Sequence, residues 1–412
     1  MMESVSTTGV GPAGHECSVP LGTRVHNTGI LLAALARVAW RYPVLRRWFL
    51  GNRLRQLTVG AEYALRTDGY SGPPRSVSFR PTLRCNAHCQ MCPYANAIDP
   101  DSQQPVTHDP QALELEVAYR LVAAIAPSHT MVNVTGGEPL LWGENLFAFL
   151  DYCRRRAVAT SVTTNGTLLG RHLEALWEAP PDILVISLLG PEETHNGIVG
   201  LNAYAAIRDA LGELYARKGG DCFRRPLVIT NTAMLPENSH VFAEVVDLSR
   251  SLGAWAANFQ PVWFATEQMH EAHERWPSAS AGSLPRASLP IDPEATDPAQ
   301  VWQQMQRARR LSAQLGQPIH FYPRLRQRDM EPYYHQPQQP VGRSRALCPY
   351  LICQVFPDGT VSPCAGVPAG NLYQQDLRAI WNGPAMRTFR RRLKAAGMLP
   401  ICSRCCFLWR ND

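Results

Sequence analysis

Long apolar runs are missing from this sequence, because no segment approaches the roughly 18 apolar residues that a membrane-spanning helix requires. Residues 1–17, MMESVSTTGVGPAGHEC, also lack the basic stretch and apolar run of a secretory signal, so we expect a cytoplasmic protein. The net charge of +6 over 412 residues is modest and does not by itself argue for a nucleic-acid partner. The length fits one large α/β domain and a smaller one.

Acidic residues are absent from residues 30–61, where six arginines are spaced along an apolar, tryptophan-containing sequence. This pattern has two interpretations. The segment can lie on an anionic surface such as a membrane, as a peripheral contact. It can also cap the fold with its apolar face, which is the commoner use of such a helix. Pro43 predicts two helices, and we expect residues 1–75 to form a basic helical extension.

Short β-branched or apolar runs alternate with helical patterns over residues 76–265. The expected strands are 76–82, 131–135, 160–165, 183–188, 227–232 and 255–262. Such alternation predicts parallel βαβ units. The expected fold class is therefore α/β, a partial (β/α)6 TIM-like barrel whose ligands bind at the carboxyl ends of the strands.

The pattern breaks after residue 265. Residues 266–345 are expected to form a linker with a proline-rich loop, a helix at about 299–316 and a strand at 318–325. Residues 346–412 hold six of the 12 cysteines and are expected to form a small cysteine-rich domain.

Three cysteines follow the first expected strand in the sequence CNAHCQMC, at Cys85, Cys89 and Cys92. Cysteines so spaced in a large chain without a secretory signal are metal ligands more often than disulfide partners. A [4Fe–4S] cube normally takes four thiolates, so three leave one iron open to a small bidentate ligand. The alternative is a zinc knuckle completed by His88.

The motif GGEP follows the second expected strand, at Gly136, Gly137, Glu138 and Pro139. Its glycines allow a close approach to a ligand, and its carboxylate can accept hydrogen bonds from an ammonium group. Alone, GGEP is an ordinary strand-to-helix turn. It becomes specific because it lies one strand after the cysteine triplet, at the same end of the predicted sheet.

These motifs together resemble the radical S-adenosylmethionine (SAM) superfamily over residues 76–265. The resemblance implies a [4Fe–4S] cluster on Cys85, Cys89 and Cys92, whose open iron binds the amino and carboxylate groups of SAM. Reduction by a donor such as flavodoxin or ferredoxin then cleaves SAM to methionine and a 5′-deoxyadenosyl radical, which abstracts hydrogen from a small-molecule substrate.

The same resemblance implies further contacts to SAM. Glu138 would hold its amino group, and an apolar residue at Met91 would pack on adenine. Thr163, Asn165 and Ser187 would contact its ribose or carboxylate. The alternative for these last four residues is an ordinary side chain satisfied by neighbouring backbone.

Residues 346–412 resemble a SPASM domain or its shortened twitch form, which carries auxiliary [4Fe–4S] clusters. The Cys-x₂-Cys-x₅-Cys-x₃-Cys run of the full SPASM pattern is absent. We therefore expect one auxiliary cluster. Its expected ligands are Cys348, Cys364, Cys402 and Cys405, with Cys353 and Cys406 as alternative ligands. A structural zinc site is the alternative.

The stretch SLLGPEETHNGIVG departs from a pattern that many SPASM-type enzymes share after the fourth strand, Ser-x-Asp-Gly…His-Asp-x-x-Arg-Gly. Leu189 replaces the first acid, Asn196 the second and Val199 the arginine. This departure argues against the usual peptide-maturase chemistry. Glu193 and His195 remain as polar catalytic candidates, with a solvated loop as the alternative for both.

The leading functional hypothesis is a two-electron oxidation, or dehydrogenation, of a polyol, aminocyclitol or sugar-type metabolite. Twitch-type dehydrogenases imply that the auxiliary cluster accepts the second electron. The alternatives are a radical SAM maturase of ribosomally made peptides and a lipid-modifying enzyme at a membrane surface. The non-enzymatic alternative is an iron–sulfur or zinc scaffold protein.

Overall fold

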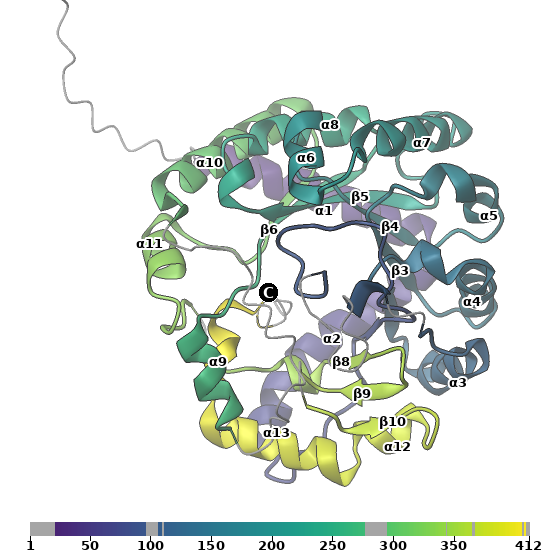
Figure 1. Cartoon of the computed structure of the whole chain (residues 1–412), viewed down its shortest axis with the longest axis vertical. Coiled ribbons are helices and arrows are strands. Elements are labelled where there is room, and N and C mark those ends of the chain that lie inside the picture. Colours follow the sequence, from purple (N-terminus) through teal and green to yellow (C-terminus); the bar gives the residue numbers. More distant parts are fainter. Residues whose placement is uncertain are drawn as a thin grey trace, which may run out of the picture.

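The computed structural model describes residues 21–95, 106–108, 111–276, 295–342, 344–364, 367–405 and 408. One ten-stranded sheet, in the order β10-β9-β8-β1-β2-β3-β4-β5-β6-β7, forms its centre. The sheet curls into an open barrel with helices around its outside (Figure 1).

All six expected strands are present, and each pairs in parallel with the next. They are β1 (Ser76–Phe79), β2 (Met131–Val134), β3 (Thr160–Thr164), β4 (Ile183–Ser187), β5 (Leu227–Met234) and β6 (Ala256–Pro261). The α/β fold with a parallel sheet and a helical N-terminal part is therefore confirmed.

The sheet also continues beyond these six strands. β7 (Ile319–Phe321) pairs in parallel with β6, and β8 (Ile352–Val355) pairs in parallel with β1. The parallel sheet thus crosses the expected domain boundaries at residues 265 and 345. The division of the chain into four domains remains a prediction.

Helices between successive strands cover the outer face of the sheet. They are α3 (Leu115–Ile125), α4 (Glu144–Arg155), α5 (Leu173–Glu178), α6 (Glu192–Val199), α7 (Tyr204–Arg217), α8 (Phe242–Ser251), α9 (Glu267–Glu274), α10 (Pro298–Leu315) and α11 (Gln327–His335). α10 shows why these segments are helical. Asp297 caps its first turn by accepting hydrogen bonds from two backbone N–H groups, and the helix ends at Gly316 in a left-handed conformation.

Two helices close the barrel at the end where its strands begin. They are α1 (Leu21–Arg41) and α2 (Pro43–Leu65), and they are separated as Pro43 predicts. Ala34, Val38 and Leu45 are buried on their inner faces. These side chains pack against the first residues of several strands, among them Met131 and Leu227. The inner faces of α1 and α2 therefore cap the fold.

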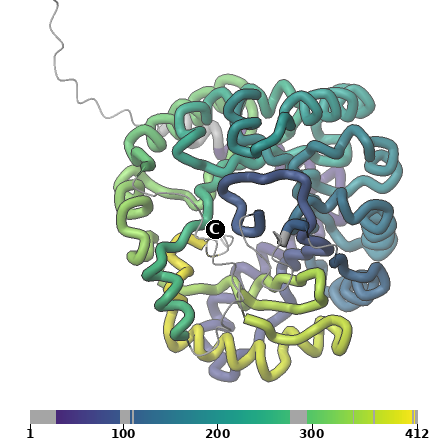
Figure 2. The backbone as a smooth tube through the Cα atoms, viewed as in Figure 1, coloured from purple at the N-terminus to yellow at the C-terminus, as the bar shows by residue number. Residues whose placement is uncertain are grey.

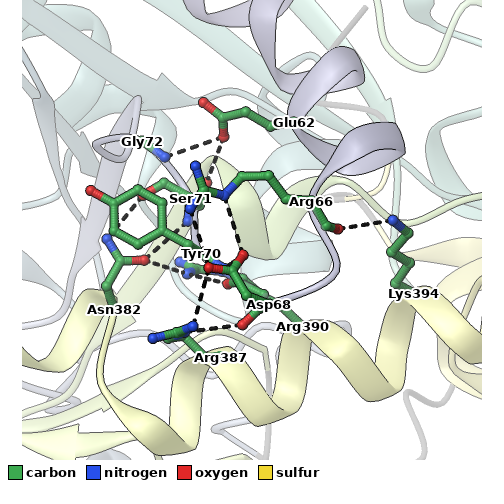
Figure 3. A network of polar contacts seen from close by, with 11 residues as sticks. Glu62, Arg66, Asp68, Tyr70, Ser71, Gly72, Asn382, Arg387, Arg390 and Lys394 are labelled. Atoms are coloured by element: carbon green, nitrogen blue, oxygen red, sulfur yellow. Dashed lines mark hydrogen bonds and ion pairs between the residues drawn. The ribbon is translucent and has the colours of Figure 1, made fainter.

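The C-terminal part adds β9 (Thr360–Ser362), β10 (Gly370–Asn371), α12 (Leu377–Trp381) and α13 (Pro384–Ala396). β8, β9 and β10 form antiparallel pairs along one edge of the sheet. Figure 3 shows how the segment after α2 is tied to α13 by a network of polar contacts. Arg390 of α13 donates hydrogen bonds to the carbonyl oxygens of Pro349 at 2.8 Å and Gly69 at 3.2 Å.

Replacing Arg390 with leucine should lower the free energy of unfolding by about 2–4 kcal/mol, because buried carbonyl groups would lose their donors. The side chain is fully buried, and burial lowers its pKa to about 9. Urea titration measures the effect. Arg391→Leu is the matched control on the same helix, because Arg391 is exposed. Equal stability of the two variants would contradict the structural role of Arg390.

Candidate active site

The three cysteines of the triplet lie on the loop that follows β1, and Figure 2 shows this dark-blue loop across the centre of the barrel. Backbone hydrogen bonds shape the loop: the Cys85 N–H donates to the Thr107 carbonyl at 3.1 Å, and the Cys92 N–H to the Cys89 carbonyl at 3.0 Å. All three side chains are partly buried. Burial raises the pKa of each thiol, that of Cys89 to about 12.

The two glycines of GGEP bring their own backbone against the segment that leads into the cysteine loop. The Gly137 N–H donates to the Thr82 carbonyl at 3.1 Å, and the Glu138 N–H donates to the Arg84 carbonyl at 2.6 Å. A side chain on Gly137 would overlap backbone atoms of Leu83 and Arg84. The backbone of the GGEP turn therefore makes a close approach, but to the segment that leads into the cysteine loop and not to a ligand.

The carboxylate of Glu138 is fully buried and joins the ends of β2 and β3. Oε1 accepts hydrogen bonds from the Leu140 N–H at 2.9 Å and the Thr164 hydroxyl at 2.8 Å. Oε2 accepts from the Asn165 N–H at 2.9 Å. Burial raises the pKa of this carboxyl group, and the three hydrogen bonds oppose that rise. One further acceptor position remains on Oε2, which leaves room for one more hydrogen bond. The contact of Glu138 with the SAM amino group stays a prediction.

Changing Glu138 to glutamine should lower the free energy of unfolding by about 1–3 kcal/mol even without SAM, because an amide NH₂ would face a backbone or hydroxyl donor. Chemical denaturation of the protein without cofactors measures this effect. Glu144→Gln, at an exposed position in the first turn of α4, is the control. An unchanged midpoint for Glu138→Gln would mean that the carboxylate serves SAM and not the fold.

Asn165 connects the end of β3 to the cysteine loop. Its Nδ2 group donates to the Asn86 side-chain oxygen at 2.9 Å and lies 3.9 Å from the Cys85 sulfur. Asn86 in turn donates to the Thr167 hydroxyl at 2.8 Å. Sequence reasoning missed Asn86, Thr164 and Thr167 as parts of this site. The only signal for Asn86 was its place beside Cys85.

The other predicted SAM contacts lie at the same end of the barrel. Thr163 and Ser187 are partly buried in β3 and β4, and Met91 packs against the main core from the cysteine loop. Pro139 is buried in the turn that follows Glu138. The structure thus places these residues at or after the carboxyl ends of β1 to β4, and their contacts with SAM remain predictions.

Residues 187–200, which depart from the SPASM-type pattern after β4, pack against the cysteine loop. The N–H groups of His88 and Gln90 donate to the carbonyls of Val199 and Ile198, both at 3.3 Å. His195 is buried on α6, accepts the Leu189 N–H on Nδ1 at 3.1 Å and has its pKa lowered to about 4 by burial.

The two polar candidates of this stretch gain no support from these contacts. Glu193 is exposed on α6, and neither it nor His195 lines the barrel cavity described below. Their catalytic roles therefore remain untested predictions. His88, the possible zinc ligand, is also exposed.

The expected auxiliary-cluster cysteines gather in the C-terminal part. Cys348, Cys364 and Cys402 share one small hydrophobic cluster. The Cys405 N–H donates to the Cys402 carbonyl at 3.0 Å. Cys353 is buried in β8 within the main barrel core. This arrangement favours the predicted four-cysteine set over one that includes Cys353, whereas Cys406 lies outside the described residues.

The donor chemistry of both groups fits iron–sulfur clusters. Thiolates are the ligands that such clusters use, and each group comes from a short span or one shared cluster of side chains. Among the described residues, no three Cys, His, Asp or Glu side chains already surround one point. The fit therefore rests on donor type and proximity. Cys85, Cys89 and Cys92 would hold one cluster, and the C-terminal set would hold the other.

A cavity of about 460 Å³ occupies the barrel interior, and its lining is mixed. The polar side chains in it include Ser78, Asn133, Thr135, Ser161, Thr163, Asn231, Asn258, Gln260 and His320, and the apolar ones are Trp48, Met131, Ile183, Val185, Ile229 and Ile352. Asn258 pairs directly with Asn231 on one side and with His320 on the other. The cavity thus runs along inward-facing strand residues up to Thr163, one of the predicted SAM contacts.

The cavity is nearly free of charge. The lining residues in the described structure include no acidic side chain and one basic one, Arg75, at the end where the strands begin. Burial, together with the positive charge of Arg324, lowers the pKa of His320 to about 4. The imidazole is therefore neutral near pH 7, and the cavity offers hydroxyl, amide and imidazole groups for hydrogen bonding.

Two family models match the chain in the regions where these features lie. The model described as the radical SAM superfamily matches residues 79–249, which contain the cysteine loop, GGEP and most of the barrel. The model described as an iron–sulfur cluster-binding domain, SPASM, matches residues 348–406. The chain is a radical SAM protein with a C-terminal SPASM domain. Its cofactors are SAM and [4Fe–4S] clusters, an auxiliary cluster among them.

Two characterised relatives resemble parts of the chain. GTP 3′,8-cyclase of Xanthomonas axonopodis pv. citri (strain 306) is 33% identical over 127 residues, which are 29% of this chain and 36% of that protein. A cysteine-type anaerobic sulfatase-maturating enzyme of Clostridium perfringens (strain 13 / Type A) is 26% identical over 174 residues, which are 39% of this chain and 46% of that enzyme. This radical SAM chain therefore spans less than half the length of either relative.

Solved structures share its fold. SuiB of Streptococcus suis, bound to the precursor peptide SuiA, has a TM-score of 0.58 at 14% identity and covers 81% of this chain and 72% of SuiB. Native anSMEcpe with bound AdoMet has a TM-score of 0.55 at 16% identity, and the match covers 81% of this chain and 88% of anSMEcpe. Identities this low show the fold alone.

Proposed function

We propose that this protein is a radical SAM oxidoreductase that removes two hydrogens from a small, uncharged polyhydroxylated metabolite. The observation that carries the proposal is the nearly uncharged cavity inside the barrel, in which strand residues present hydroxyl and amide groups beside apolar side chains. Its volume of about 460 Å³ falls in the range of about 300–1,000 Å³ that small-molecule sites occupy.

The lining chemistry narrows the substrate class. Hydroxyl and amide groups that a ligand leaves unpaired are costly when buried, so a ligand with several hydroxyl groups on a carbon skeleton matches this mixed lining. Asn133, Asn231 and Asn258 each provide both donors and acceptors. No acidic side chain in the described lining could pair with an ammonium group. A polyol or sugar alcohol therefore fits better than an aminocyclitol.

The chain's own residues hold the reacting parts together. The cysteine loop, GGEP and Asn165 are joined by hydrogen bonds at the carboxyl ends of the strands, and the cavity reaches Thr163 of β3 at this end, which supports a cofactor site next to the substrate site. When bound, the clusters and SAM supply a carbon radical that takes one hydrogen atom, and an acceptor for the electron that leaves with the second hydrogen as a proton.

A mass-based assay of wild type and one cavity variant tests the proposal. The reduced, anaerobically reconstituted protein would be given an aqueous cell extract from which molecules above about 1 kDa have been removed. We expect one compound to lose two daltons as 5′-deoxyadenosine forms. Asn258→Leu should lower this yield more than tenfold, because a good substrate would lose at least one pair of hydrogen bonds. Product from Asn258→Leu at the wild-type rate would contradict the proposal.

Peptide maturation is the second candidate. The resemblance to a cysteine-type anaerobic sulfatase-maturating enzyme over 174 residues favours it. Under this alternative, only the extract fraction above about 1 kDa would stimulate formation of 5′-deoxyadenosine. The same assay therefore separates the two candidates.

A further inference from the structure

The outer faces of α1 and α2 are apolar as well as their inner faces. Trp40 is 81% exposed, and the exposed fractions of Leu50, Leu54 and Leu57 lie between 64% and 79%. At about 100° per residue, these side chains lie opposite the buried Leu45 on α2 and Val38 on α1. Helices that only cap a fold keep their outer faces polar, so this exposed surface needs another explanation.

The same outer face is basic. Arg46, Arg47 and Arg53 are exposed between the leucines of α2. Glu62 is the first acidic residue after this stretch, and it forms an ion pair of 2.9 Å with Arg55, a side chain that is largely buried. Apolar side chains interspersed with arginines, and no acidic residue among them, match a negatively charged and partly apolar partner.

We propose that this surface docks on an anionic membrane, with α1 and α2 lying in the plane of the lipid headgroups. The docking face is formed by Leu32, Trp40, Leu50, Leu54, Leu57 and Leu65 together with the three arginines. Leucine and tryptophan would enter the boundary between headgroups and acyl chains, and the arginines would contact lipid phosphates. None of the described helices is long and apolar enough to cross a membrane, so the contact is peripheral.

Charge argues against a second copy of the chain as the partner. A two-fold interface through this face would gather the three arginines of each copy in one contact, with no acidic residue of the face to pair with them, and like charges across an interface are unfavourable. Anionic lipid headgroups instead neutralise them. The arginines therefore favour the membrane over self-association.

The docking face lies at the end of the barrel opposite the chemistry. α1 and α2 pack on the first residues of the strands, such as Met131 and Leu227, whereas the cysteine loop and GGEP follow the strand ends. In Figure 1 the two purple helices accordingly lie behind the barrel. The docked protein would thus hold its cysteine loop on the side away from the bilayer, so membrane binding goes beyond the proposed function and does not depend on a lipid substrate.

Vesicle flotation tests the docking face. The full-length protein would be mixed at low salt with vesicles of phosphatidylcholine alone or of phosphatidylcholine with about one-third phosphatidylglycerol. We expect flotation with the anionic vesicles only, and its loss at high salt. The variant Leu50→Ser/Leu54→Ser/Leu57→Ser should reduce the bound fraction more than tenfold, because three apolar anchors are removed. Leu201→Ser, at an exposed leucine outside this face, is the matched control and should float like wild type.

Each other result overturns the proposal. It is wrong if wild type stays unbound at low salt, or if it floats equally well with neutral vesicles. It is also wrong if the triple variant instead abolishes a dimer of the wild-type chain. The triple variant should keep wild-type SAM cleavage and thermal stability, because its three side chains are exposed and far from the cysteine loop. Failure of docking is thereby distinguished from failure of the proposed enzymatic function.

Discussion

Changing Cys89 to alanine should abolish reductive cleavage of SAM. Cys89 is one of three cysteines that are available on the loop after β1, and a cluster that lacks a thiolate ligand is poorly retained. The loss of a single hydrogen-bonding partner outside a metal's direct ligands typically costs 10- to 100-fold, so removal of a ligand should cost more than about 100-fold. The measurement is 5′-deoxyadenosine formed by the reduced, reconstituted protein, together with its iron content.

Cys222→Ala is the control for this variant. Cys222 is also partly buried, but it lies between α7 and β5, at the end of the barrel where β5 begins. We expect the control to keep its iron and its SAM cleavage. Wild-type activity of Cys89→Ala, or zinc in place of iron in the reconstituted wild type, would contradict the cluster assignment.

Changing Cys402 to alanine should remove the auxiliary cluster and abolish product formation while leaving SAM cleavage in place. Cys402 lies in the small hydrophobic cluster that also contains Cys348 and Cys364. The variant should therefore contain roughly four fewer iron atoms per chain. Formation of 5′-deoxyadenosine without a matching oxidised product would show that the electron acceptor is missing. Iron analysis and product yield are measured on the same preparation.

Cys353→Ala is the control that decides between the two possible ligand sets. Cys353 is fully buried, and burial raises its pKa to about 12, but it packs in the barrel core beside β1. Its replacement should cost about 1 kcal/mol of stability through lost packing and leave the iron content unchanged. If Cys353→Ala loses iron and Cys402→Ala does not, the predicted auxiliary ligands are wrong.

The six barrel strands were predictable because each is a short apolar or β-branched run between helical patterns. The rule that ligands bind at the carboxyl ends of parallel strands then placed the cysteine loop and GGEP together, and the structure joins them by backbone hydrogen bonds. The extensions of the sheet were harder to foresee. β8 pairs with β1, from which it is separated by most of the chain, and no local pattern encodes such a long-range partner.

The role of individual side chains was less predictable than their location. Glu138 was expected to face a ligand, but Thr164 and Asn165 satisfy much of its carboxylate. The asparagines that line the cavity were also hard to foresee as neighbours. Asn231 and Asn258 occupy inward-facing positions that alternate along their strands, yet only the register of β5 and β6 brings the two residues opposite each other.

The most direct test of the account is to follow hydrogen from substrate to cofactor. The reduced protein would be given the small-molecule fraction, below about 1 kDa, of an extract from source cells grown in deuterated medium. The account predicts deuterium in the 5′-deoxyadenosine that forms, together with one compound that has lost two hydrogen isotopes. Formation of 5′-deoxyadenosine without deuterium in this fraction, and with deuterium only when larger peptides are supplied, would contradict it.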